Sequence, residues 1–388
     1  MAGAPSAGGM MLPPPGMGGP AAPAMAGGAA ATIPATAPVS QGGGSAGSGG
    51  SVNPNAGATL VPASVVTPAA GAVGRERPQP SADVLAATRL AWELARAGDL
   101  RNYLLDWAVG KFRSSSGSET VVISNDGSGY VPDGVYLPRD VRLLVADPLV
   151  EREFRDYWFG WQDPARVLVA YAGLRAANGW QLVAAASTGP VDALREVHIE
   201  CGWADRERSP LTNENWQPPG LDGLHVHRLE LEYPSLYEGL QRVAKVGGPY
   251  HERVMWPLAS QLWTAARAAS VDIPLVLRSV WKILEANSEP PAEVWDEFGR
   301  ELNRYSIMEV GVKRAGFGCA SPAADPSDRE AYRAHWLVAR TMEVIGGWEH
   351  RPLPLADMAY AASAIGRGDI RAELEPRLRM IEDELRQS

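Results

Sequence analysis

The stretch from Val121 to Val145 alternates short apolar runs with turn residues, and the rest of the chain is organised around it. Its β-prone runs are Val121–Ile123, Tyr130–Val131 and Leu143–Val145. Between them lie Asn125 to Gly129 and Pro132-Asp133-Gly134, which form turns because Asn and Asp bond their own backbone and glycine tolerates positive φ. The glycines match neither G-x-G-x-x-G nor the Walker motif, so we interpret them as turn residues. The pattern predicts a β-meander.

Helical and strand-like patterns surround this meander. Ser81 is a plausible N-cap, and leucines at helical spacing follow it as far as Trp107. Asp147-Pro148 predicts a second helix that runs to Gly160, because proline is favoured at the first helical position. The β-prone runs 166–174 and 180–186 flank Asn178-Gly179, which is a strong signal for a hairpin.

The pattern weakens towards residue 235. Pro190 and Asp192 predict a short helix, while Val197 and Ile199 alternate as in a strand. Residues 209–223 are rich in Pro, Asn and Gly and read as a long loop, and 224–231 read as a last strand or the start of a helix. Together these elements predict an α+β domain over residues 82–235.

Beyond Pro234 the strand signals vanish and apolar residues recur at helical spacing. The predicted helices cover residues 235–246, 250–269, 274–287, 291–315, 327–346, 355–365 and 369–386. Prolines and a Ser-x-x-Glu capping box mark several of their starts. We therefore expect an all-α helical domain over residues 236–388.

Composition separates the first part of the chain from the rest. No charged residue occurs from Met1 to Gly74, and no aromatic residue precedes Trp92. Such a segment cannot bury enough apolar surface to offset its chain entropy, so residues 1–80 are expected to be a disordered low-complexity tail. The formal net charge is −9, which argues against binding to nucleic acid or to anionic membranes.

Other sequence features narrow the location of the protein. No apolar run is long enough for a membrane span, and the N-terminus lacks the pattern of an ordinary secretory signal. The two cysteines, Cys201 and Cys319, do not make a disulfide framework, so a reduced, cytoplasmic protein is the simplest expectation.

One stretch resembles the opening of a catalytic motif. His198-Ile199-Glu200-Cys201 contains the H-x-E of zinc deaminases, in which a histidine and two thiolates hold the metal and the glutamate moves protons. The second half of that motif, P-C-x-x-C, is absent, so a metal would lack ligands. We expect no metal and no cofactor, and these residues are only the best site for an alternative function, an enzyme of unrecognised class.

Two further arrangements of histidines could form a metal site or a catalytic pair. His225 and His227 could present two imidazoles on one face of a strand, with Glu230 or Glu232 as a possible third ligand. Solvent-facing histidines on an edge strand are the simpler interpretation. Cys201 could pair with His335 or His251 as nucleophile and base, but no local signature supports this.

The densest aromatic cluster is Tyr157-Trp158-Phe159-Gly160-Trp161. Helical spacing places Phe154, Trp158 and Trp161 near one face, which we expect to pack onto the sheet. Tyr157 and Phe159 are then left over, and they are our candidate residues for binding a partner protein.

Residues from about 82 to the C-terminus resemble the C-terminal region of the EspK family of mycobacterial type VII (ESX-1) secretion-associated proteins. The resemblance is carried by four segments: ISNDGSGYVPDGVYLP, DYWFGWQDPARVLVAYAGL, SIMEVGVKRAGFGCASP and IGGWEHRPLPLADMAYAA. A Pro/Gly/Ala-rich region before them is a further similarity. It implies a cytosolic helper that binds a secreted substrate of the type VII system and assists its export, and it transfers no functional residues.

The sequence thus predicts an α+β fold with a helical second part and a non-enzymatic function. The expected protein is a chaperone or adaptor for a type VII substrate, with no catalytic residues and an oligomeric state that the sequence leaves open. The competing hypothesis places an enzyme site at His198, Glu200 and Cys201, and requires these side chains to converge in a concave pocket.

Overall fold

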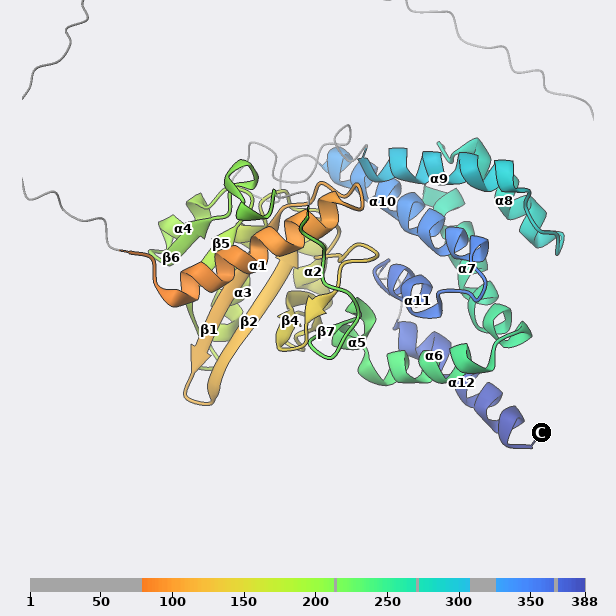
Figure 1. Cartoon of the computed structure of the whole chain (residues 1–388), viewed down its shortest axis with the longest axis horizontal. Coiled ribbons are helices and arrows are strands. Elements are labelled where there is room, and N and C mark those ends of the chain that lie inside the picture. The colour runs from red at the N-terminus through yellow and green to blue at the C-terminus, as the bar shows by residue number, and fades with distance from the viewer. Residues whose placement is uncertain (1–78, 213–214, 270–271, 308–325, 366–368, 388) are drawn as a thin grey trace, which may run out of the picture. The chain divides into compact units, whose positions relative to one another are not determined.

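The computed structural model describes residues 79–212, 215–269, 272–307, 326–365 and 369–387, all within one compact unit of the chain (Figure 1). The tail predicted for residues 1–80 lies outside the described residues apart from its last two positions. In the described ranges, no helix combines the length and the apolar character that crossing a bilayer requires.

A mixed sheet of five strands in the order β4-β2-β1-β5-β6 forms the first half of the described chain. The strands are β1 (Trp107–Ser114), β2 (Gly117–Ser124), β4 (Val141–Leu143), β5 (Gln181–Ser187) and β6 (Glu200–Trp203). β1 pairs antiparallel with β2 and β5, whereas β4 and β6 add in parallel at the two edges. A small ribbon of β3 (Leu137–Pro138) and β7 (His225–Val226) lies apart from this sheet.

Helices cover both faces of the sheet. Trp107, Val109 and Val122 share a core with α1 (Ala82–Asp99), and their neighbours Ala108 and Val121 share another with α3 (Pro164–Ala176). This alternation follows from the period of two in a strand. The smaller helices are α2 (Arg152–Trp158), α4 (Asp192–Glu196) and α5 (Arg228–Glu232). Figure 1 shows α1 lying across the strands.

The predicted hairpin over residues 166–186 is wrong, because its first half is helix α3. Asp163 caps this helix by accepting from the backbone N–H groups of Ala165 and Arg166, and Pro164 occupies the first turn. Gly179 has a φ of +77°, and the N–H groups of Gly179 and Trp180 donate to the carbonyls of Ala176 and Arg175. These two bonds form a Schellman motif, so the Asn-Gly pair ends a helix here.

The segment predicted as a meander also differs in its pairing. β2 ends at Ser124, and Tyr130 and Val131 are buried without forming a strand. The next main-sheet strand, β4, pairs with β2 in parallel. Gly134 has the positive φ expected of its turn, +71°. Contacts with helices distant in the sequence hold this segment, and no strand ladder does so.

Other predicted boundaries shift by a few residues. Ser81 does cap α1, but α1 ends at Asp99 and Trp107 begins β1. The helix predicted from Pro148 starts at Arg152, because Asp147 bonds its own loop at the Leu149 N–H. The short helix after Pro190 is α4, and the strand signal near Ile199 is β6. Of two short 3-10 turns, η2 (Arg206–Arg208) precedes the predicted long loop and η3 (Pro210–Thr212) lies within it.

The second half consists of helices, as predicted. They are α6 (Pro234–Val246), α7 (Pro249–Ala269), α8 (Leu275–Glu285), α9 (Ala292–Ile307), α10 (Pro326–Gly346), α11 (Leu355–Ser363) and α12 (Ile370–Gln387), with a 3-10 turn η5 (Gly347–Glu349). The predicted extension of α9 to residue 315 lies outside the described residues. Their core is continuous with the α1 face of the sheet. The α+β class is confirmed, and the domain boundary at residue 235 stays a prediction.

Candidate functional site

Residues 125–136, which we call the central loop, connect β2 to β3 and lie against α10 and α11. The Tyr332 hydroxyl of α10 donates to Asp126 Oδ1 at 2.6 Å and accepts from the Gly127 N–H at 2.9 Å. The Val131 N–H donates to the Tyr360 hydroxyl of α11 at 3.3 Å. The helices therefore supply partners that a buried loop cannot find in itself.

Two glycines permit this close approach. Gly127 has a φ of +53°, and a Cβ there would lie 2.7 Å from the Trp336 ring. Gly160, just after α2, has a φ of +65°, and a Cβ there would lie 2.1 Å from the Tyr332 ring. Glycine is needed at both positions for its backbone conformation and for its lack of a side chain.

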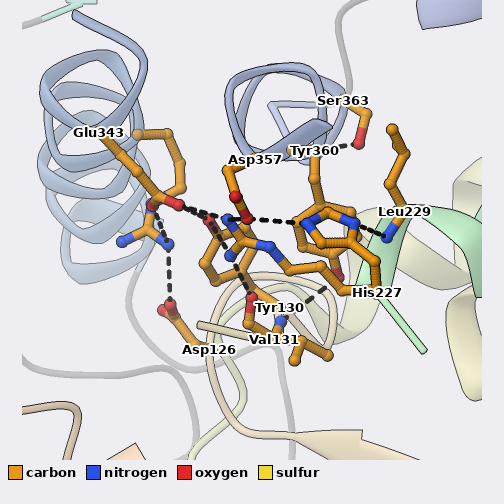
Figure 2. Close-up of polar contacts among 11 residues, drawn as sticks. Asp126, Tyr130, Val131, His227, Leu229, Glu343, Asp357, Tyr360 and Ser363 are labelled. Atoms are coloured by element: carbon orange, nitrogen blue, oxygen red, sulfur yellow. Dashed lines mark hydrogen bonds and ion pairs between the residues drawn. The ribbon is translucent and has the colours of Figure 1, made fainter. Parts of the chain in front are cut away.

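Two buried arginines bind the central loop to the helices, and Figure 2 labels their partners Tyr130, Glu343 and Asp357. Arg228, only 1% exposed, donates to the Tyr130 hydroxyl (2.9 Å), the Val131 carbonyl (2.6 Å), Glu343 (2.9 Å) and Asp357 (3.0 Å).

The second arginine, Arg340, is paired with Glu343 at 3.2 Å and lies over the Tyr130 ring at 4.0 Å. Burial raises the pKa of Tyr130 and keeps its hydroxyl protonated, although the charge of Arg228 acts in the opposite direction. We call Asp126, Tyr130, Arg228, Arg340, Glu343 and Asp357 the junction network.

His227 extends the junction network. Its Nδ1 accepts from the Leu229 N–H at 3.0 Å and so caps α5, which leaves the proton on Nε2. Nε2 therefore donates to Asp357 at 2.8 Å. Burial disfavours the charge of Asp357, but the hydrogen bond from His227 and the charge of Arg228 outweigh it and lower the pKa of Asp357.

A cleft of about 760 Å³ lies beside this network, and we call it the junction cleft. It is lined by the end of α2, the residues around Tyr233, helices α10 and α11, and residues Ser128 to Tyr130 of the central loop. Its aromatic lining residues are Tyr130, Phe159, Tyr233, Trp336 and Tyr360. A concave site of this size with a mixed polar and aromatic lining has the features of a binding pocket.

The arginines of the cleft are directed at acceptors within the protein. Arg155 donates to the backbone carbonyls of Val150 and Val145 at 3.2 and 2.7 Å. Arg333 of α10 donates to the Asp156 carbonyl and carboxylate at 2.9 and 3.3 Å, where α2 approaches its negative C-terminal end. These bonds fix α2 against α10.

The two candidate partner-binding residues, Tyr157 and Phe159, differ in their surroundings. Tyr157 is 46% exposed. Phe159 lines the junction cleft and packs on Tyr332 and Trp336, with ring centroids 5.7 and 5.1 Å apart. As expected, Phe154, Trp158 and Trp161 pack into the core of the α3 face. The binding role of Tyr157 and Phe159 stays a prediction.

The residues of the alternative enzyme site lie spread along the start of β6. His198 is exposed, with a φ of +58°. Glu200 is exposed and accepts from the Ser81 N–H at 2.8 Å, so it supports the start of α1. Cys201 packs against the core of the α3 face, and burial raises the pKa of its thiol. This geometry does not assemble a nucleophile with a base.

The histidines that the sequence analysis paired also lie in different surroundings. His225 bonds Asp222 at 3.1 Å, whereas His227 is buried in the junction network. His251 on α7 and His335 on α10 contact the carbonyls of Val243 and Tyr305, in the helical half. Over the described ranges of the chain, no group of three His, Cys, Asp or Glu side chains could hold a metal ion.

The sequence drew attention to the central loop but not to its partners. Arg228 follows His227 in an ordinary polar run, and Arg340 lies within an amphipathic helix. The one local signal is the set of glycines in the loop, because close approach of another element is one reason for glycine. No pattern in the sequence indicates which element approaches.

These elements define an α+β protein whose sheet half is joined to a helical half through a buried ionic network. Residues 96–244 match the family model of the EspK C-terminal domain. The predicted resemblance to the EspK C-terminal region is thereby confirmed over these residues. The matched segment begins in α1 and ends in α6, so it includes the central loop but not α10 and α11.

A solved structure is also similar to the chain. It is a fragment of the conserved hypothetical protein Rv3899c from Mycobacterium tuberculosis, with 16% sequence identity and a TM-score of 0.36 over 74% of this chain and 96% of that one. No curated protein matches the sequence.

Proposed function

We propose that this chain is a non-enzymatic binding protein that acts as an adaptor or chaperone for a protein exported by type VII secretion. The observation that supports this proposal is the junction cleft, about 760 Å³ in volume and lined by aromatic and charged side chains. Aromatic and arginine side chains supply much of the binding energy where proteins recognise each other. We place this role in the cytoplasm, where a helper meets its cargo before export.

The end of α2 is the part of the cleft most suited to a partner. Asp156 and Phe159 line the cleft, and Tyr157, between them in the sequence, is exposed. Tyr157 also stacks edge-on against Trp158 at 5.1 Å, which orders its ring before binding. An exposed but ordered aromatic ring loses little conformational entropy when it is covered.

The two candidate anchors call for different tests. Removing the Tyr157 ring leaves the core intact, and loss of such an anchor typically costs about 2 kcal/mol, or roughly thirtyfold in affinity. Removing the Phe159 ring also takes away its packing on Tyr332 and Trp336. A loss of binding in Phe159→Ala is therefore informative only if the thermal midpoint is unchanged.

A crosslinking experiment tests the proposal directly. A photoreactive phenylalanine analogue is placed at Tyr157 of the full chain, and as a control at Leu275 on α8, which is 77% exposed. We expect position 157, and not position 275, to crosslink one type VII exported protein whose binding can be reconstituted from purified components. Tyr157→Ala should then weaken that binding. Equal labelling from both positions, or a purified pair that does not bind, would refute the proposal.

A further inference from the structure

Glu232 is the feature of the junction cleft that points to a particular ligand chemistry. It ends α5, is half-buried and lines the cleft. Burial raises the pKa of its carboxyl, although a hydrogen bond with the Tyr233 hydroxyl and the charge of Arg155 act in the opposite direction. A carboxyl whose ionised form is disfavoured by its surroundings gains from an added positive charge.

The arginines of the cleft already have other partners, so the position of a cation at Glu232 is open to a ligand. The charge of Arg155 acts on Glu232, but the hydrogen bonds of Arg155 go to the carbonyls of Val150 and Val145. Arg152 and Arg333 are paired with Asp156 at 3.5 and 3.3 Å. An anionic ligand would have to displace these internal acceptors, whereas a cationic ligand would meet Glu232 without breaking them.

The walls near Glu232 are aromatic. Tyr360 lines the cleft together with Glu232; burial raises the pKa of its hydroxyl, and the charge of Glu232 adds to this effect. Tyr233 is its neighbour in sequence, and burial and Glu232 raise the pKa of this phenol as well. Aromatic rings around a carboxylate favour a cation on an apolar stem, because both the charge and the stem find partners.

We propose that the junction cleft binds a lysine or arginine side chain, with its cationic group at Glu232 and its stem against the half-buried rings of Tyr233 and Phe159. The inference rests on the proposed function, since the exported partner carries that side chain. Glu330 on α10 is exposed at the same cleft and adds negative charge to it.

The site has a defined dependence on pH. The charged and titratable groups that face Glu232 are Tyr233, Arg155 of α2 and Tyr360 of α11, and Asp369 acts on Tyr233 from beside α12. A bound cation favours the ionised carboxylate, so binding releases a proton from Glu232. Affinity should therefore rise as pH increases through the raised pKa of Glu232 and fall on acidification.

Three small probes of the same shape test the chemistry on the full chain: phenethylammonium, phenylacetate and 2-phenylethanol. Binding is followed by ligand-observed NMR and by shifts of the tyrosine ring protons. We expect phenethylammonium to bind more tightly than the other two, and Glu232→Gln to weaken it about tenfold. Glu153→Gln, which removes an exposed charge from α2 outside the cleft, should leave the affinity unchanged. Phenylacetate binding at least as tightly, or unchanged affinity in Glu232→Gln, would overturn the proposal.

A second variant tests the site in case Glu232→Gln disturbs folding. Ala334→Trp fills the cleft from α10 and leaves Glu232 intact, so it should also abolish binding of phenethylammonium. If this variant, at an unchanged thermal midpoint, still binds the probe, the probe lies elsewhere and the inference fails. Failure of the probes with successful crosslinking from position 157 would reject the cationic side chain alone. Failure of the crosslinking would reject the proposed function instead.

Discussion

Arg175 and Arg228 are both buried arginines that hold carboxylates and phenols, yet they join different parts of the molecule. Arg175 donates to Asp147 at 2.7 Å, to Glu119 at 2.8 Å and to the Tyr171 hydroxyl at 3.0 Å, so its partners come from β2, from α3 and from the loop before α2. We call these four residues the sheet network.

Arg228 instead joins the central loop to α10 and α11 through the junction network. The sheet network lies wholly within the segment that matches the EspK C-terminal domain, and the junction network reaches beyond it. The same chemistry thus stabilises one core in the first case and joins two halves in the second. It follows that the central loop of the matched segment depends on helices that the segment does not contain.

Removing each arginine in turn should have the largest effect. Arg228→Met leaves Glu343 and Asp357 without their buried cation, which typically costs about 3–5 kcal/mol, and Arg175→Met should cost a similar amount. The location should differ: hydrogen exchange should rise in the central loop for Arg228→Met and in β2 and α3 for Arg175→Met. Urea unfolding gives the magnitudes. The same exchange pattern in both variants would contradict the comparison.

An exposed arginine is the control for this pair. Arg242 binds Glu382 at 2.7 Å, but its side chain is 57% exposed. Arg242→Met should therefore change the free energy of unfolding by no more than about 0.5 kcal/mol.

Two glycine substitutions are expected to cause the next largest losses of stability. Gly160→Ala adds a Cβ 2.1 Å from the Tyr332 ring, whereas Gly179→Ala adds one with nothing within 4 Å, and both have positive φ. Gly179→Ala should cost about 1 kcal/mol from backbone strain alone, and Gly160→Ala about 1–3 kcal/mol more from overpacking. Thermal unfolding measures both, and equal losses would mean that α10 does not pack against Gly160.

A smaller effect is expected from removing one phenol hydroxyl that bonds an aspartate of each network. Tyr332→Phe leaves Asp126 and the Gly127 N–H without this partner, and Tyr171→Phe removes a 2.6 Å bond to Asp147. Each loss should cost about 1–3 kcal/mol. Exchange of the Gly127 amide should increase only in Tyr332→Phe. Its increase in Tyr171→Phe would show that the two networks are coupled.

The smallest expected effect is on the acid dependence of stability. Burial alone would raise the pKa of both Asp147 and Asp357, but hydrogen bonds from Tyr171 to the first and from His227 to the second outweigh it, and both pKa values are lowered. The unfolded chain then binds more protons, so this stability is present above the ordinary aspartate pKa and is lost as pH falls towards the lowered values.

Asp357→Asn should flatten the acid limb of the stability curve, measured by urea unfolding from neutral to acidic pH. Glu232 has the opposite sign, because its raised pKa favours the folded state at low pH and this contribution is lost as pH rises through that value. Glu232→Gln should remove that loss and should not flatten the acid limb. An unchanged acid limb in Asp357→Asn would show that the carboxylate does not couple folding to protons.

The sequence by itself determined the elements whose signals are local. The helices α6 to α12 follow from apolar periodicity and prolines, Ser81 caps α1 through its own side chain, and Gly134 has the positive φ that its turn predicts. These features depend on residues within a few positions of each other, so a linear pattern is enough to predict them.

Only the tertiary structure decided how the central loop is used. Residues 166–174 are β-prone but pack as α3 on the sheet, where Asp163 and the turn at Gly179 end the helix on both sides. Tyr332 lies 206 positions from Asp126, and Glu343 lies 115 from Arg228. Contacts at such separations are set by how the two halves pack and leave no periodic trace, so the junction network and the cleft beside it were beyond reach of the pattern alone.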